Sequence, residues 1–222
     1  MVPLLLLSLA SLALVVTGVL RRPGIGITLA LLVVGYSVLY RQHTWTQMGF
    51  RHQPNWAGTI SLALILGSAI ALLATGLIDP AAEYLTGEPH DISIVEGIRG
   101  NAGVLARWLI VVWLFVAVLE ELVFRGYLMS ELATILPGSF WGLAANLIIT
   151  SIIFGLAHAY QGPSGALSAT LIGSLIGIVF LGSGFNLWLV ILIHGIIDTI
   201  QLTLLYAGRY DMIKRAIIKP GN

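Results

Sequence analysis

Six ionisable side chains interrupt three apolar stretches in the second half of the chain. They are Glu120, Glu121, Arg125, His158, His194 and Asp198. These residue types suit the hydrolysis of an amide bond, in which a carboxylate takes a proton from water while imidazoles and hydrogen-bond donors stabilise the developing oxyanion. Because all six come from only three predicted helices, we expect them to converge on one site.

The first stretch, EELVFR, directly follows the apolar run VVWLFVAVL. On a helix of 3.6 residues per turn, Glu121 and Arg125 lie four residues apart on one face, whereas Glu120 points about 100° away from Glu121. A buried ion pair that fixes helix packing is a sufficient explanation for Glu121 and Arg125. Glu120 has no such local counterion, so the two carboxylates are expected to have separate functions.

The other two stretches each place a histidine four residues from a second candidate. FGLAH puts Phe154 and His158 on one helix face at the end of an apolar segment, and HGIID puts His194 and Asp198 on one face in the middle of another. A histidine at a helix end is often structural, and a His–Asp pair can simply link two helices. Burial of such a pair in an apolar span favours proton transfer or ligand binding instead.

The whole composition is strongly apolar. Of the 222 residues, 58% are hydrophobic and only 9% are charged, and the mean hydropathy is +0.96. Soluble domains carry about 25% charged residues, and a spanning helix takes roughly 20 apolar residues. We therefore predict an all-α, polytopic transmembrane helical bundle in which residues 1–222 form a single integral membrane domain in a lipid bilayer.

Seven apolar stretches are candidates for spans. They run at about residues 3–20, 24–40, 57–78, 104–136, 140–158, 165–182 and 186–206. The 104–136 stretch exceeds one perpendicular span, so we expect it to tilt, protrude or break in two, which would give eight helices. The first stretch lacks the preceding positive charge of a secretory signal and is expected to be a retained span. Loops are expected at 41–56 and 79–103.

Charge and cysteine content exclude several partners and cofactors. The chain has 11 Lys or Arg against 10 Asp or Glu, a net charge of +1, which gives no basic surface of the kind that nucleic acid requires. The absence of cysteine excludes disulfides, iron–sulfur clusters and thiolate zinc sites. Any metal would need histidine and carboxylate ligands, and no pattern specifies an oligomeric state.

Basic residues are unevenly distributed over the predicted loops. With seven spans, one side holds Arg21, Arg22, Arg99, Arg209, Lys214, Arg215 and Lys219, and the opposite side holds Arg41 and Arg51. An excess of Lys and Arg in short loops stays on the cytoplasmic side. We therefore expect the N-terminus outside and the C-terminus in the cytoplasm.

Taken together, the three stretches resemble the motifs of the CPBP (CAAX protease and bacteriocin-processing) intramembrane proteases, which include the CAAX prenyl endopeptidases. The family motifs read Glu-Glu-x-x-x-Arg, Phe-x-x-x-His and His-x-x-x-Asn or Asp. EELVFR, FGLAH and HGIID match them in the family order. The resemblance covers residues 104–206, which we expect to form the catalytic core.

The resemblance implies an intramembrane endopeptidase with a membrane-embedded catalytic cavity. Glu120 would activate water, His158 would position or polarise that water, and His194 with Asp198 would form the oxyanion site. The supporting residues would be Glu121, Arg125 and Phe154. Glu120 lies well inside its predicted helix and His158 at the end of its own, so helix tilt or a recessed loop must bring the two together.

The substrate implied by the resemblance is a membrane-associated peptide, which is prenylated in the CAAX branch of the family. Family members of this size occur in prokaryotes, where they are commonly linked to peptide or bacteriocin self-immunity. A prokaryotic cell membrane is therefore the expected location of the chain.

Asp198 raises a question about the oxyanion site, because an asparagine there could donate a hydrogen bond whereas an ionised aspartate can only accept one. Asp198 is therefore either protonated, or orients the ring of His194, or completes a metal site with Glu120, His158 and His194. The older description of the family as metalloproteases keeps zinc as the alternative. We favour the metal-free glutamate mechanism, with no cofactor.

Two other classes of function remain open from the residues alone. Buried Glu, His and Asp side chains also build the proton relays and ion sites of transporters and channels. A noncatalytic immunity or partner-binding membrane protein could use the same polar cluster only to lock its helices together. Replacing Glu120 by Gln separates these classes from a protease, which alone would lose turnover while keeping its fold.

Overall fold

The computed structural model describes residues 31–32, 35, 44–210 and 212–213, and every regular element within them is helical. The all-α prediction is therefore confirmed for this part of the chain. The first two expected spans, at 3–20 and 24–40, fall almost entirely outside the described residues. The same holds for the basic residues Arg21, Arg22, Arg41, Lys214, Arg215 and Lys219.

Five helical segments are long and apolar enough to cross a membrane. They are Trp56–Thr86, Ala102–Ile135, Phe140–Ala157, Ala159–Gly182 and Leu187–Tyr206. Each corresponds to one of the last five apolar stretches of the sequence, because a run of about 20 apolar residues has no other way to satisfy its backbone in lipid. The chain is an integral membrane protein by this criterion.

Two of these segments are composite, with α-helical and wider π-helical turns in one continuous run. The first contains α3 (Trp56–Leu73), η1 (Ala74–Ile78) and α4 (Asp79–Thr86), and the second contains α5 (Ala102–Val111), η3 (Val112–Val116), α6 (Ala117–Glu121), η4 (Leu122–Met129) and α7 (Ser130–Ile135). The 104–136 stretch is thus one unbroken run of helix. At 1.5 Å per residue it exceeds the roughly 30 Å hydrocarbon core, so it must tilt or protrude.

The loop expected at 79–103 begins later than predicted, because helix α4 continues to Thr86 and Gly87 ends it with a φ of 73°. The charged residues that suggested a loop have partners. Asp79 accepts a hydrogen bond from the Tyr210 hydroxyl (2.7 Å), and Glu83 accepts one from the backbone N–H of His90 (2.8 Å). Pro80 lies within this continuous run, directly after the wider π-helical turns of η1, where the regular helical hydrogen-bond pattern is already interrupted. The true loop covers residues 87–101.

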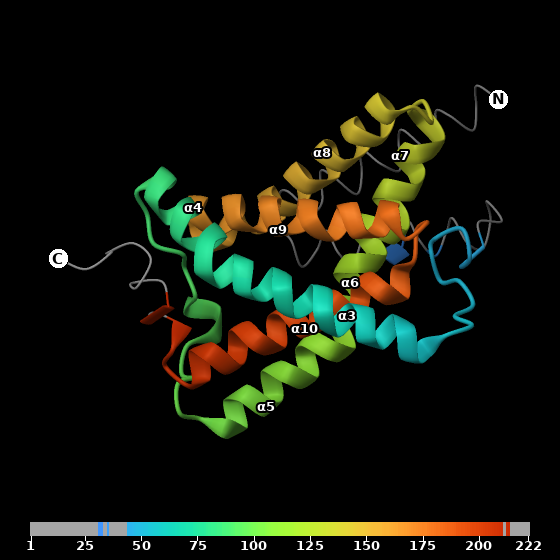
Figure 1. Cartoon of the computed structure of the whole chain (residues 1–222). Coiled ribbons are helices and arrows are strands. Elements are labelled where there is room, and N and C mark those ends of the chain that lie inside the picture. Colours follow the sequence, from blue (N-terminus) through green and yellow to red (C-terminus); the bar gives the residue numbers. More distant parts are fainter. Residues whose placement is uncertain (1–30, 33–34, 36–43, 211, 214–222) are drawn as a thin grey trace.

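The remaining long helices are α8 (Phe140–Ala157), α9 (Gly162–Gly182) and α10 (Leu187–Tyr206). They pack in pairs, α3 on α10 and α8 on α9, as Figure 1 shows. The closest approaches are at glycines: a Cβ on Gly67 would lie 3.1 Å from the carbonyl oxygen of Ile193, and one on Gly155 would lie 2.5 Å from that of Ala166. Small residues thus set the spacing of both pairs.

The connections gather at two ends of the bundle (Figure 1). At one end, residues 44–55 meet the 183–186 turn, where the N–H of Leu187 donates to the carbonyl of Gly49 (3.0 Å). At the other end, residues 87–101 meet both 158–161 and the segment after α10. There the N–H of Asp91 donates to the carbonyl of Gln161 (3.0 Å). We call the second end the 87–101 end.

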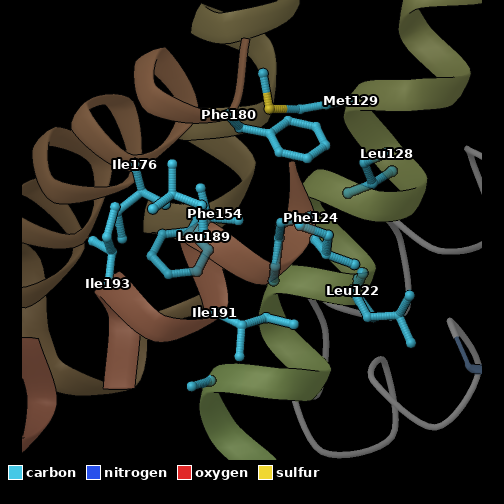
Figure 2. Packing of buried hydrophobic residues seen from close by; sticks show 14 of the residues in the cluster. Leu122, Phe124, Leu128, Met129, Phe154, Ile176, Phe180, Leu189, Ile191 and Ile193 are labelled. Carbon is cyan, nitrogen blue, oxygen red and sulfur yellow. The ribbon is translucent and has the colours of Figure 1, made fainter. Parts of the chain in front are cut away.

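The core surrounds η4, in which every residue from Leu122 to Met129 is buried. Figure 2 shows these side chains interleaved with those of α8, α9 and α10. The rings of Phe124 and Phe154 meet edge to face with centroids 4.9 Å apart, and Phe180 is completely buried near Met129. This packing holds η4, and with it the adjacent Glu120 and Glu121, in a fixed orientation.

Candidate active site

Glu121 is a fully buried carboxylate with two partners. Its Oε1 accepts a hydrogen bond from Arg125 Nη1 (2.9 Å) and another from His194 Nδ1 (2.7 Å). The i, i+4 ion pair predicted from the sequence is therefore present. The same carboxylate also reaches across to the middle of α10, a link that spacing within one helix could not indicate.

Arg125 is used entirely inside the protein. Besides its bond to Glu121, its Nη2 donates to the carbonyl oxygen of Gly173 (2.8 Å), and its guanidinium lies 4.7 Å from the ring centroid of Phe154. These contacts join η4, α8 and α9. Arg125 is 2% exposed, so its function is to hold helices and neighbouring side chains in place.

The ring of His194 is oriented by Glu121. A carboxylate only accepts, so the Nδ1 of His194 carries the hydrogen of the 2.7 Å bond. The opposite nitrogen, Nε2, then points toward Asp198, whose Oδ2 lies 3.6 Å away, beyond direct hydrogen-bond distance. Orienting this ring, one of the roles left open for Asp198, is thus performed by Glu121.

Glu120 faces His158, on a different side of the helix from Glu121. His158 donates from Nδ1 to the carbonyl oxygen of Phe154 (2.8 Å), which leaves its Nε2 3.7 Å from Oε2 of Glu120. That oxygen of Glu120 is buried and makes no hydrogen bond. His158 follows the last residue of α8, yet its ring reaches Glu120, so the depth difference inferred from the sequence is closed.

One cavity of about 250 Å³ brings the four candidate catalytic residues together. It is lined by Glu120, His158, His194 and Asp198. Much of the remaining wall is apolar, from Trp108, Val112, Val116, Ile172, Ile176 and Ile197. At the 87–101 end lies the polar part of the cavity, with His90, Asp91 and Gln161 beside the apolar Ile92, Ile94 and Val95.

Several lining residues were not identified from the sequence. They are Asp79, His90, Asp91, Tyr160, Gln161 and Ser168. The only sequence signal for the first of them is a lone carboxylate directly after the apolar stretch 57–78. Asp91 accepts a hydrogen bond from the backbone N–H of Ser93 (2.8 Å), which lowers the pKa of its carboxyl below the ordinary value. Asp91 is therefore charged at neutral pH.

Among the residues that the structure describes, no group of three His, Asp or Glu side chains is placed to hold a metal ion. His158 and His194 each donate from Nδ1 to a protein oxygen, which leaves Nε2 for another partner. Such bonds also orient metal-binding histidines, so they do not count against zinc. The chemistry derived below follows the metal-free mechanism.

Residues 102–200 match the family model described as type II CAAX prenyl endopeptidase Rce1-like. We call residues 102–200 the Rce1-like segment because they are similar to this family, and the match is consistent with the CPBP resemblance of the motifs. The Rce1-like segment contains all three motifs, from Glu120 to Asp198. Asp79 and the 87–101 loop precede it. No curated protein and no solved structure matches the chain.

Proposed function

We propose that this chain is an intramembrane endopeptidase that hydrolyses a peptide bond in a membrane-associated peptide, with Glu120 as the general base. The observation that carries the proposal is the buried, unbonded carboxylate oxygen of Glu120, which faces the Nε2 of His158 across 3.7 Å in the shared cavity. A polar separation of this size, between two groups without another partner, suits a bridging water.

The first chemical step is attack by that water. The Nδ1 of His158 is held as a donor by the Phe154 carbonyl, so its Nε2 accepts a hydrogen bond from the water, which keeps that hydrogen as its oxygen attacks. Glu120 takes the other proton as the water oxygen adds to the carbonyl carbon of the scissile bond. The product is a tetrahedral intermediate with a negative oxygen.

His194 and Asp198 stabilise that oxygen by sharing one hydrogen. Because Nδ1 of His194 already donates to Glu121, the shared hydrogen lies either on Nε2 of His194 or on Oδ2 of Asp198, 3.6 Å apart. Either location supplies a donor to the oxyanion. An aspartate at position 198 is thus compatible with the role that an asparagine would perform by its amide.

Collapse of the intermediate completes the reaction. The C–N bond breaks as Glu120 returns its proton to the departing nitrogen. One product is a new carboxylic acid, which then ionises, and the other is a new amine. Glu120 thus acts first as base and then as acid, and ends the cycle as it began.

The substrate proposed is an apolar peptide at the membrane. The matched family is described by its action on prenylated CAAX proteins, and the apolar part of the cavity, which includes Trp108 and Ile172, is compatible with apolar side chains or an isoprenoid. The Rce1-like match favours this class over a transporter or a noncatalytic immunity protein, neither of which has a comparable observation in its support.

The test is cleavage of a peptide library by the purified protein in detergent. The library contains prenylated and unprenylated members, and products are analysed by mass spectrometry in ¹⁸O-labelled water with and without a chelator. We expect new C-termini that carry one ¹⁸O, at equal rates in both conditions. Loss of cleavage in chelator would contradict the metal-free mechanism, and uncleaved peptides throughout would contradict the endopeptidase.

A further inference from the structure

Asp79 is a buried carboxylate that the proposed reaction does not use. It is the first residue of α4, is 1% exposed and lines the cavity. Its Oδ2 accepts from the Tyr210 hydroxyl at 2.7 Å, whereas its Oδ1 has no hydrogen-bond partner. A buried carboxylate oxygen without a hydrogen bond is unfavourable, so this oxygen lacks a donor that a ligand could supply.

A second unused polar group lies on the facing helix. Ser168 in α9 is 1% exposed and lines the same cavity, and its hydroxyl oxygen has no hydrogen-bond partner. Helix α4 packs against α9. Two buried polar side chains from neighbouring helices are thus available to a ligand, separate from the pairs formed by Glu120 and His194.

The charges that line the cavity indicate the sign of that ligand. Four acidic residues line it, Asp79, Asp91, Glu120 and Asp198, and within the described residues no Lys or Arg does. A cavity lined by one sign of charge attracts the opposite sign. His158 and His194 also line the cavity, but His158 lies beside Glu120 and His194 beside Asp198, so neither is paired with Asp79.

The surroundings of Asp79 also suit the shape of a basic side chain. Leu202 and Leu205 line the cavity and pack in one apolar cluster with Tyr210, the residue that holds Asp79. Lysine and arginine combine an apolar stem with a charged end, and they bind where apolar surface leads to a polar group.

We propose that Asp79 forms a subsite for a lysine or arginine side chain of the peptide substrate, so that the enzyme prefers a peptide bond near a basic residue. This inference rests on the endopeptidase function proposed above. It adds a basic residue to the proposed substrate. The subsite residue Asp79 belongs to α4, which lies outside the Rce1-like segment.

The test uses binding by the full chain with Glu120→Gln, which holds peptides without turnover. The probes are fluorescent, apolar eight-residue peptides with blocked ends, in which a single lysine occupies each position in turn, with matched norleucine and glutamate peptides. We expect at least one lysine peptide to bind about tenfold more tightly than its norleucine match. The glutamate match should bind more weakly than both.

Adding Asp79→Asn should reduce the lysine preference to less than about threefold while leaving norleucine-peptide binding unchanged. Tyr210→Phe keeps the carboxylate of Asp79 but removes the hydroxyl that positions it, so the lysine preference should fall to an intermediate value. This variant tests the subsite if Asp79→Asn does not fold. Glu88→Gln, at an exposed carboxylate outside the cavity lining, is the matched control and should leave the lysine preference unchanged. Equal binding of lysine and norleucine peptides, or a lysine preference that survives Asp79→Asn, would overturn the proposal.

Cleavage by the wild-type chain is measured separately on the same peptides, so that the two proposals can fail independently. A lysine preference in binding without any cleavage would support the Asp79 subsite and contradict the endopeptidase. Cleavage that is equally fast for lysine and norleucine peptides would support the endopeptidase and contradict the subsite.

Discussion

Two adjacent glutamates with different partners are the central feature at the scale of single residues. The Oε1 of Glu121 is bonded to Arg125 and His194, and the Oε2 of each glutamate is buried without a hydrogen bond. Glu120 differs in that it lines the cavity, with its Oε2 beside His158. The separation of about 100° between neighbouring positions on a helix explains how one dipeptide supplies both a structural and a reactive carboxylate. The geometry is compatible with the division of roles expected from the sequence, which stays a prediction.

The Glu121–Arg125 pair yields a prediction that separates stability from activity. Arg125→Met should lower the free energy of unfolding by about 3–5 kcal/mol, because it leaves a buried carboxylate without its cation. The double variant Glu121→Leu, Arg125→Met should recover much of that stability, since an apolar pair needs no counterion. It should not recover peptide cleavage, because His194 has lost the acceptor that orients its ring.

Unfolding in detergent and peptide cleavage are measured on both variants. If the double variant is as unstable as Arg125→Met, the unpaired carboxylate of Glu121 is not the cause of the lower stability of Arg125→Met. Cleavage by the double variant at the wild-type rate would show that His194 needs no orientation by Glu121.

The sequence predicted the candidate residues better than it predicted their partners. Glu120, His158, His194 and Asp198 stand out because each is an ionisable group in an apolar stretch, and they do line one cavity. Asp79 does not stand out, since it sits between an apolar run and Pro80, where a loop is a natural interpretation. Its partner Tyr210 is 131 residues away, a separation that periodicity cannot detect.

At the scale of helices, the length of an apolar stretch predicts that a helix is present better than it predicts where that helix begins and ends. The five described spans were all anticipated, but α4 extends eight residues beyond the expected end of its stretch, from Asp79 to Thr86. The π-helical segments η3 and η4, which flank the short helix that carries Glu120 and Glu121, were not anticipated. Such wide turns often occur at functional sites and have no strong signal in residue spacing.

Close contact between α8 and α9 depends on Gly155. A Cβ there would clash with the Thr170 hydroxyl and lie 2.5 Å from the carbonyl oxygen of Ala166, which as backbone cannot move aside. Gly155→Ala should therefore force the helices apart and lower the free energy of unfolding by about 1–3 kcal/mol. Thermal unfolding in detergent measures the effect.

The matched control is Gly182→Ala, at the end of α9, where a Cβ would meet nothing within 4 Å. This variant should be neutral or slightly stabilising because alanine favours the helical backbone over glycine. Equal unfolding temperatures for the two variants would contradict the close packing of α8 on α9.

At the scale of the whole molecule, the cavity belongs to one end of the bundle. Arg99 and Arg209 lie at the 87–101 end, together with the polar part of the cavity, whereas Arg51 lies at the opposite end near Gly184. The distribution of basic residues predicts that the 87–101 end faces the cytoplasm. A peptide substrate would then approach from the cytoplasmic side.

Cysteine labelling tests this orientation in a chain that has no native cysteine. Single substitutions Glu96→Cys and Met212→Cys should be protected from a membrane-impermeant maleimide added to intact cells. His52→Cys and Gly138→Cys, at the opposite end, should react with it. The reverse pattern would place the N-terminus inside and the mouth of the cavity outside.

The most direct test of the central claim compares Glu120→Gln with the wild-type chain and with Glu96→Gln, a control at an exposed loop position. Single-turnover cleavage of one peptide substrate is measured together with peptide binding and thermal unfolding. We predict a fall of about 10²–10⁴-fold in the cleavage rate for Glu120→Gln, with binding and unfolding unchanged, and no effect of Glu96→Gln. Cleavage by Glu120→Gln at the wild-type rate would remove Glu120 as the base and contradict the mechanism.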